Sequence, residues 1–255
     1  MLDRSERATS FGAAAREYDR YRVGPPPQAL DSLLPPNCAS VLDLGAGTGL
    51  LTRQLVGRVD EVIAVDPDIR MRDVLNEACP RATSLAGTAE CIPLPDSRVD
   101  AVMVSAAWHW MDPARALPEI ARVLRPGGTF AVLWTRRDRR VPWVAELDAF
   151  VRELTGSGDE VERRIQHMSN HAWLPDDAPF TDVTSCVLTW DVPMTSEAVV
   201  GMFTTYSGFI TQSDEAKRQL TLRITARISA AALPTQGLVR MPMACHAWRL
   251  RRAAD

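Results

Sequence analysis

The stretch VLDLGAGTGLL, residues 41–51, decides the fold of this chain. Gly45, Gly47 and Gly49 stand at alternate positions directly after a short apolar run, and this run contains Asp43. Glycines between a strand and a helix let the chain turn tightly and let a ligand touch the backbone. The start of the following helix offers free N–H groups. The stretch therefore predicts a ligand site at the end of a first strand.

The order of residues in this stretch separates it from two phosphate-binding motifs. A dinucleotide site of the G-x-G-x-x-G type requires a glycine where this chain has Leu50, and a P-loop requires a lysine, which is absent here. The pattern is instead D-x-G-x-G-x-G. A carboxylate is a poor neighbour for a pyrophosphate and a good one for a cation. We expect a ligand with a positive part near Asp43 and a flat or sugar part on the glycines.

Apolar runs alternate with helical segments on both sides of this stretch. The predicted strands are SVLDLG (40–45), EVIAVD (61–66), ATSLAG (82–87), VDAVMVSA (99–106) and TFAVLW (129–134). The predicted helices between them are GLLTRQLVGR (49–58), PDIRMRDVLNEACP (67–80) and DPARALPEIARVLRPGG (112–128), the last ended by Pro126 and two glycines. Strands without polar alternation, separated by helices, indicate a parallel sheet covered on both faces. We predict a doubly wound, Rossmann-like α/β fold.

The outer parts of the chain are mostly helical. Helices are predicted at 9–22, in a short segment after GPPP (24–27), from about 143 to 166, from an N-cap at Thr195 or Ser196, and over most of 214–233. Strands are predicted at 180–192 and 239–252. Because no repeat or flexible linker interrupts the chain, we expect a single domain.

Composition excludes several classes of protein. The 255 residues carry a formal charge of −3, which gives no reason to expect nucleic-acid binding. The five cysteines form no C-x-x-C pair, so we expect neither a disulfide framework nor structural zinc. His167 and His171 have metal-ligand spacing without completing residues, and we expect no metal. With no signal peptide or apolar run of membrane-spanning length, we expect a soluble, cytoplasmic protein that does not bind membranes.

Asp66 ends the second predicted strand, and its position suggests what the ligand contains. A carboxylate at this place accepts hydrogen bonds from the two vicinal hydroxyls of a ribose. Together with the cation expected near Asp43, this describes a ligand with an adenosine-like sugar and a positive amine or sulfonium. S-adenosylmethionine has both features.

These residues belong to a wider resemblance. From Phe11 to roughly Asp138 the chain resembles the class I S-adenosylmethionine-dependent methyltransferases, through VLDLGAGTG, VIAVDPD, GTAECIPLPDSRVDAV and EIARVLRPGGTFAV in order. FGAAAREYDRYR and AAWHWMDP are similar to a small-molecule subgroup that includes trans-aconitate methyltransferases and uncharacterised actinobacterial relatives. Two features depart from this subgroup. RVGPPP replaces its R-P-x-Y-P, and Thr88 stands where an aspartate often contacts adenine.

The resemblance implies a seven-stranded, mostly parallel sheet and a division of the single domain 1–255. Residues 1–36 would form a helical lid, 37–136 the cofactor-binding core, and 137–255 a helical insertion with the last strands, helping to form the substrate pocket. The implied cofactor-binding residues are Asp43, Gly45, Ala46, Gly47, Asp66, Pro67, Thr88, Ala89, Glu90, Ser105 and Tyr18. The residues implied to line the substrate site are Trp108, Trp110 and Tyr206.

The activity implied is in-line methyl transfer to a small organic acceptor. His109, between the two tryptophans, is the candidate catalytic residue: either a general base or part of a wall that excludes water. A protein that binds the cofactor or its product without chemistry is the alternative, and a dehydrogenase is a weaker one, opposed by Leu50. The sequence identifies neither the acceptor nor an oligomeric state.

Overall fold

The computed structural model describes residues 14–156, 163, 174–175, 177–210, 212–231 and 238–253. The chain divides into two compact units. The helical unit comprises Met1–Val23, Arg136–Asp159 and Thr189–Ala244, and the sheet unit comprises Gly24–Thr135, Glu160–Leu188 and Cys245–Asp255. The single domain expected from the sequence, with its three segments, stays a prediction. The predicted helical residues 9–13 and most of 156–166 lie outside the described residues, as do both histidines at 167 and 171.

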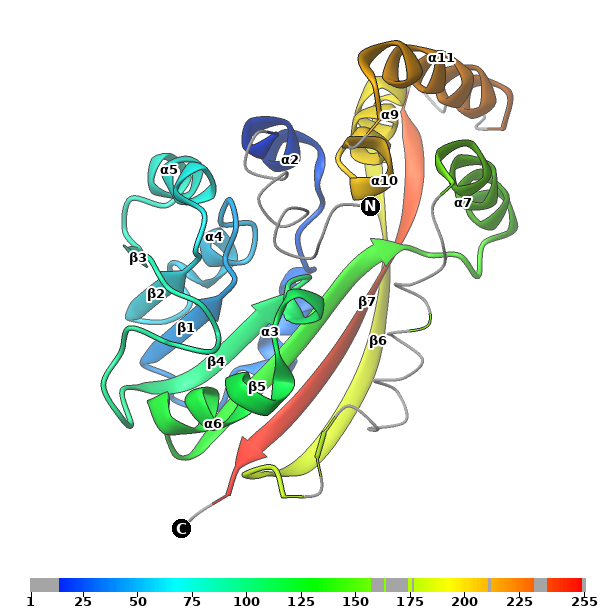
Figure 1. The fold of residues 1–255 in the computed structure, drawn as a ribbon. Helices are drawn as coiled ribbons and strands as arrows, with labels where there is room; N and C mark the ends of the chain where they lie inside the picture. Colours follow the sequence, from blue (N-terminus) through cyan, green and yellow to red (C-terminus); the bar gives the residue numbers. More distant parts are fainter. Residues whose placement is uncertain are drawn as a thin grey trace. The chain divides into compact units, whose positions relative to one another are not determined.

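Seven strands form one sheet in the order β3-β2-β1-β4-β5-β7-β6 (Figure 1). Their bounds are β1 Ser40–Leu44, β2 Glu61–Val65, β3 Thr83–Leu85, β4 Val99–Ser105, β5 Leu124–Arg137, β6 Phe180–Met194 and β7 Val239–Arg252. The pairs β1–β2, β1–β4, β2–β3 and β4–β5 are parallel. Figure 1 shows β7 running opposite to β5, so the sheet is mixed. The predicted doubly wound α/β fold is confirmed, and its switch point lies between β1 and β4.

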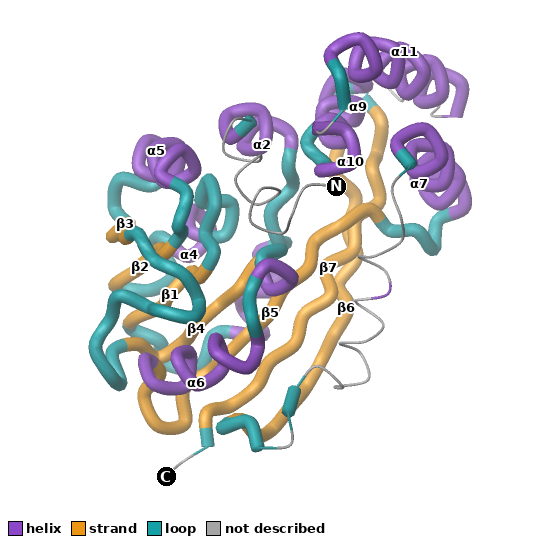
Figure 2. Tube along the Cα trace, viewed as in Figure 1, coloured by secondary structure: helices purple, strands orange, loops and turns teal. Residues whose placement is uncertain are grey.

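Figure 2 shows the helices in purple. Their bounds are α2 Ala15–Tyr21, α3 Pro27–Leu33, α4 Thr52–Leu55, α5 Ile69–Ala78, the 3₁₀ helix η1 Trp108–Trp110, α6 Pro113–Val123, α7 Pro142–Thr155, α9 Ser196–Thr204, α10 Ser207–Ile210 and α11 Asp214–Ala231. The predicted cap of α9 is confirmed, because the Thr195 side chain accepts a hydrogen bond from the Ala198 N–H at 3.1 Å. No helix among the described residues is long and apolar enough to cross a membrane.

Two predicted helices are shorter in the structure. The one expected at 49–58 keeps only the single turn of α4, because Gly49 and Gly57 on its two sides have φ of +87° and +92°. The one expected to continue to Pro126 ends at Val123. Leu124 already pairs with Val99 of β4, so the chain has entered the sheet before it reaches the proline.

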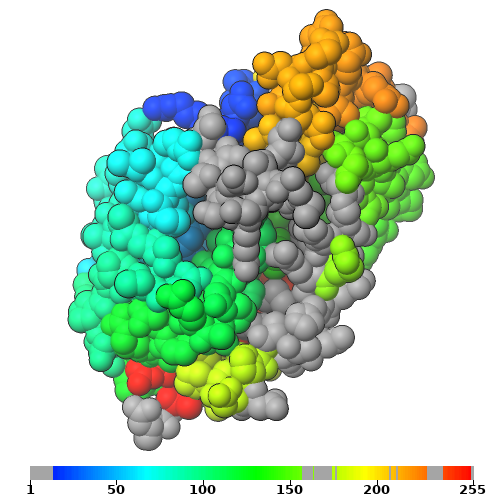
Figure 3. Space-filling view, viewed as in Figure 1, coloured from blue at the N-terminus to red at the C-terminus, as the bar shows by residue number. Residues whose placement is uncertain are grey.

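The core of the sheet unit lies on both faces of the sheet. Successive side chains of a strand point to opposite faces. In β2, Ile63 packs in the same cluster as Ile120 of α6, whereas the next residue, Ala64, packs with Leu75 of α5. The helices α5 and α6 therefore cover opposite faces, and both lie at the surface of this unit (Figure 3). Between them, all five residues of β1 are buried.

The helical unit has a core of its own. Apolar side chains from α7, α9 and α11 meet in one buried cluster that includes Leu147, Phe203 and Ile224. Each of these three is at most 2% exposed. This cluster packs α7, α9 and α11 against one another.

Candidate functional site

The glycine loop after β1 lies against the end of β2. The N–H groups of Gly45 and Ala46 both donate to the carbonyl of Val65, at 2.8 and 3.1 Å. Gly45 and Gly47 have φ of +71° and +56°, in the left-handed region that favours glycine. A Cβ on Gly45 would lie 2.7 Å from the Cβ of Ala107, whereas a Cβ on Gly47 would meet none of the described atoms within 4 Å. The loop is thus closed on one side and open at Gly47.

Asp43 lies behind this loop and is 1% exposed. Its Oδ2 accepts a hydrogen bond from the Thr52 hydroxyl at 2.6 Å. Its Oδ1 is buried and has no hydrogen-bond partner among the residues that the structure describes. Burial raises the pKa of Asp43 to about 7, although the Thr52 bond opposes the rise. A covered carboxylate with an unsatisfied oxygen favours a cation beside the loop, through its charge rather than by direct contact.

Asp66, at the end of β2, is tied to the loop directly. Its Oδ2 accepts the Gly47 N–H and its Oδ1 accepts the Asp68 N–H, both at 2.9 Å. Burial raises its pKa, and these two bonds partly offset the rise. Each carboxylate oxygen can accept a second bond. Arg72 of α5 holds the same turn, donating to the carbonyls of Asp66 and Pro67 at 2.8 and 3.0 Å.

The predicted adenine segment, Thr88, Ala89 and Glu90, follows β3. Ala89 is 3% exposed, and Thr88 is exposed. The Glu90 Oε1 accepts the N–H of Asp112 at 2.8 Å. Burial opposes ionisation of Glu90, but the bonds from Asp112 and from the Thr88 side chain outweigh it and lower its pKa. Glu90 thereby joins the adenine segment to the start of α6, a link that the sequence did not predict.

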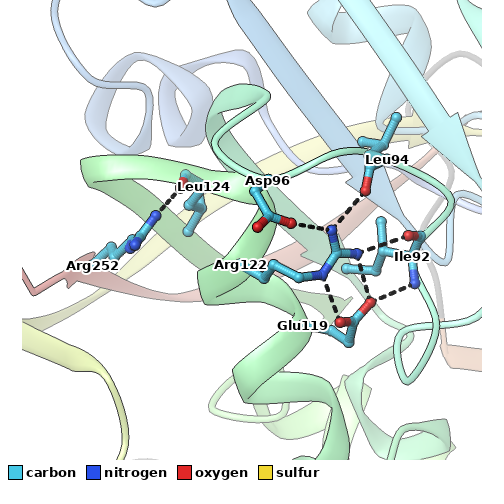
Figure 4. Close-up of polar contacts among 7 residues, drawn as sticks. All are labelled: Ile92, Leu94, Asp96, Glu119, Arg122, Leu124 and Arg252. Carbon is cyan, nitrogen blue, oxygen red and sulfur yellow. Dashed lines mark hydrogen bonds and ion pairs between the residues drawn. The ribbon is translucent and has the colours of Figure 1, made fainter.

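Arg122 and Glu119 of α6 form a polar cluster that holds the chain just beyond this segment (Figure 4). Arg122 donates to the carbonyls of Ile92 and Leu94, at 3.0 and 2.8 Å, and to Asp96 at 2.9 Å. Glu119 accepts from Arg122 and from the Ile92 N–H. Neither Arg122 nor Glu119 was predicted from the sequence. Their i, i+3 spacing was the available signal, but it is equally typical of a solvated ion pair on a helix surface.

Ser105 is the last residue of β4, and the segment after it holds the two tryptophans. Ala106 has φ of +54°, which is uncommon for a residue with a side chain, and Ala107 follows it against Gly45. Ser105 is half-buried at the last parallel pair of β4 with β5. The turn at Ala106 therefore brings the segment after β4 to the glycine loop.

The tryptophans and His109 have different surroundings. Trp108 is 5% exposed and packs on Phe130, with ring centroids 5.5 Å apart. The His109 ring stacks on Trp134 at 5.2 Å and lies tilted on Trp110 at 4.5 Å. Trp108 is thus part of the core of the sheet unit, while His109 and Trp110 are half-buried. Their predicted roles toward a substrate stay predictions.

Tyr18 and Tyr206 belong to the helical unit, whereas the residues described above belong to the sheet unit. The hydroxyl of Tyr206 accepts a bond from Nη1 of Arg137 at 2.9 Å. Their predicted contacts with cofactor and substrate stay predictions. Within the described ranges, no group of three or more His, Cys, Asp or Glu residues is arranged to hold a metal ion.

The strand order, with carboxylates at the ends of β1 and β2 beside a glycine loop, defines a Rossmann-like methyltransferase fold. Residues 42–132 match the family model described as methyltransferase domain. The chain is 45% identical over 222 residues to the uncharacterized methyltransferases Rv3342 of Mycobacterium tuberculosis and Mb3374 of Mycobacterium bovis, covering 87% of this chain and 86% of each of them. A solved structure from Anaeromyxobacter dehalogenans, described as a type II methyltransferase, is 25% identical with a TM-score of 0.68, over 92% of this chain and 100% of that one. The chain belongs to the S-adenosylmethionine-dependent methyltransferase family.

Proposed function

We propose that the protein transfers a methyl group from S-adenosylmethionine to a small organic acceptor. The proposal rests on the positions of Asp43 and Asp66. These two carboxylates lie at the ends of adjacent strands, on either side of the open glycine loop. One carboxylate is buried with an unsatisfied oxygen, and the other keeps acceptor capacity next to Gly47. A molecule with a cationic part and a ribose matches both.

The residues of the sheet unit fit this cofactor. Asp66 would accept hydrogen bonds from the ribose hydroxyls, and the backbone at Ala89 and Glu90 would border the adenine. The carbonyl of Ser105 would accept a hydrogen bond from the methionine ammonium group. The negative charge of Asp43 would stabilise the positive charge of the cofactor. When bound, the cofactor supplies a methyl group that is already activated for transfer. The protein's part is then alignment of the acceptor and exclusion of water.

His109 has two candidate roles. A general base would take a proton from an acidic hydroxyl or similar acceptor. A wall residue would shape the pocket and keep water out, and a carboxylate acceptor would need no base. The stacking of His109 on Trp134 and its contact with Trp110 favour the wall, because both ring contacts are those of a packed side chain.

A substrate screen tests the proposed activity. The native protein is incubated with S-adenosylmethionine and panels of small acids, phenols and amines, and the release of S-adenosylhomocysteine is measured. We expect release with at least one acceptor class, and none from Gly47→Val, whose side chain would enter the open side of the loop. Tight cofactor binding with no release from any panel would favour the non-catalytic binding protein instead.

A further inference from the structure

Arg22, in the helical unit, is held in one orientation by its neighbours. Its Nε donates to the Thr205 hydroxyl at 2.8 Å, and its Nη2 donates to the Thr205 carbonyl at 3.0 Å. The guanidinium carbon lies 3.7 Å from the ring centroid of Tyr206 and 4.9 Å from that of Tyr18. Thr205 itself is fully buried. The plane of the guanidinium is therefore fixed by two hydrogen bonds and two ring contacts.

This half-buried cation has no carboxylate partner in the part of the chain that the structure describes. The nearby buried acid, Asp148, is already shared: its Oδ1 accepts Nε of Arg137 at 2.6 Å and its Oδ2 accepts Nε of Arg139 at 2.7 Å. A guanidinium has five N–H donors, and beyond the two bonds to Thr205 no described residue accepts a hydrogen bond from the Nη1 edge of Arg22.

Tyr206, whose ring lies against the Arg22 guanidinium, carries a second donor, its hydroxyl. Its hydroxyl oxygen accepts Nη1 of Arg137, and no described residue accepts its proton. Burial opposes ionisation of the phenol, yet Arg137 and Arg22 lower its pKa, which marks the surroundings as electropositive. A cation and a hydroxyl that both lack an acceptor are costly when partly buried, unless a ligand accepts their hydrogen bonds.

We propose that the Nη1 edge of Arg22 and the hydroxyl of Tyr206 form a binding site for an organic oxyanion, a carboxylate or a phosphate. The planar guanidinium can meet either group with two parallel N–H bonds. This inference goes beyond the proposed function, because such a molecule would bind whether or not it is methylated.

Helix α2, which ends immediately before Arg22, offers a matched control. Arg20 is also next to a tyrosine, with its guanidinium carbon 5.0 Å from the Tyr21 ring. Unlike Arg22 it has an acidic partner, Glu197, at 3.1 Å, and its side chain is 67% exposed. Removing the charge at Arg20 changes the net charge of the protein as much as removing it at Arg22, but leaves the proposed site intact.

The test is calorimetric titration of the full chain with succinate, inorganic phosphate and the neutral analogue succinamide. We expect succinate or phosphate to bind the native protein and Arg20→Gln equally, and Arg22→Gln about tenfold or more weakly, the scale of a lost charge-assisted bond. The anion that binds more tightly shows whether the site prefers a carboxylate or a phosphate. Binding that is equal in all three proteins, binding of succinamide as tight as succinate, or no anion binding to the native protein would overturn the site.

Two further measurements keep the outcome interpretable. Tyr206→Phe keeps the ring beneath Arg22 and removes only the hydroxyl, so it applies even where Arg22→Gln fails to fold. A folded Tyr206→Phe that binds the anion as tightly as the native protein would contradict the assignment of the hydroxyl. Titration of the native protein with S-adenosylmethionine separates the two proposals: cofactor binding without anion binding contradicts this inference alone, and the reverse contradicts the proposed function alone.

Discussion

Asp43 is the residue whose protonation should control cofactor binding. Its pKa, raised to about 7 by burial, means that the cofactor-free protein carries a mixture of the neutral and ionised forms near neutrality. A cation beside the loop favours the ionised form, so binding must expel a proton at lower pH. The affinity for the cofactor should therefore be highest above the raised pKa of Asp43 and should fall as the pH drops below it.

We predict that the dissociation constant for S-adenosylmethionine rises by up to about tenfold for each pH unit below about 7. Asp43→Asn, which keeps the shape but not the charge, should bind more weakly and show a much flatter profile. The measurement is calorimetry of both proteins from about pH 5 to about pH 8. A native profile that matches that of Asp43→Asn would contradict an electrostatic role for this carboxylate.

His109 gives a second prediction for a single residue. As a wall residue, it can be replaced in His109→Gln with most of the turnover retained, and any loss of rate at low pH persists in the variant. As a general base, its replacement would cost roughly 100-fold or more in turnover, with cofactor affinity nearly unchanged. We expect the first result. The pH–rate profiles of both forms at saturating cofactor, with an acceptor from the screen, decide between the two.

At the scale of an element, the glycine loop contains two positions that share a backbone conformation and differ in their surroundings. Both Gly45 and Gly47 have positive φ, but only Gly45 faces a neighbouring Cβ, that of Ala107. Alanine should therefore cost about 1–2 kcal/mol of stability at Gly47, from the left-handed conformation alone. At Gly45 it should cost roughly 1–3 kcal/mol more, because the loop after β4 must also move.

Urea unfolding of Gly45→Ala and Gly47→Ala measures this difference, and calorimetry adds the functional contrast. Gly47→Ala should remain folded and bind S-adenosylmethionine more weakly, because its methyl group projects into the open side of the loop. Equal stability of the two variants would show that the approach of Ala107 does not constrain the loop.

The cluster around Arg122 holds the chain just beyond the predicted adenine segment (Figure 4). Arg122→Met removes the donors to two backbone carbonyls and should lower the free energy of unfolding by about 1–3 kcal/mol. Arg98→Met is the matched control: the two arginine side chains are 31% and 32% exposed, but among the described residues the Arg98 side chain pairs only with the surface acid Glu61. Its loss should cost at most about 1 kcal/mol. Thermal or urea unfolding compares them, and equal losses would mean that the carbonyl bonds contribute nothing.

The sequence could predict the features that depend on local contacts but not those that depend on contacts between distant residues. The strands of the sheet and the cap at Thr195 depend on apolar runs and on neighbouring residues, and the structure has each of them at the predicted segment, although β5 begins earlier, at Leu124. The end of α6 at Val123 was missed because it depends on pairing with β4. The bond from Asp112 to Glu90 was missed for a similar reason, since it joins residues 22 positions apart.

At the scale of the whole molecule, each of the two units carries one of the two proposed binding sites. The sheet unit has the glycine loop with Asp43 and Asp66, and the helical unit has Arg22 beside Tyr206. Family membership accounts for the first group and not for the second. The central claim is that the first group binds S-adenosylmethionine.

Calorimetric titration with S-adenosylmethionine, with NAD as the competing ligand, tests this claim most directly. The native protein should bind one S-adenosylmethionine per chain and no NAD. Asp66→Ala should lose about 1.5–3 kcal/mol of binding free energy, the scale of a charged hydrogen-bond acceptor. Asp73→Ala, which removes an exposed acid on α5, should lose none. Unchanged affinity in a folded Asp66→Ala variant, or tighter binding of NAD than of S-adenosylmethionine, would contradict the account.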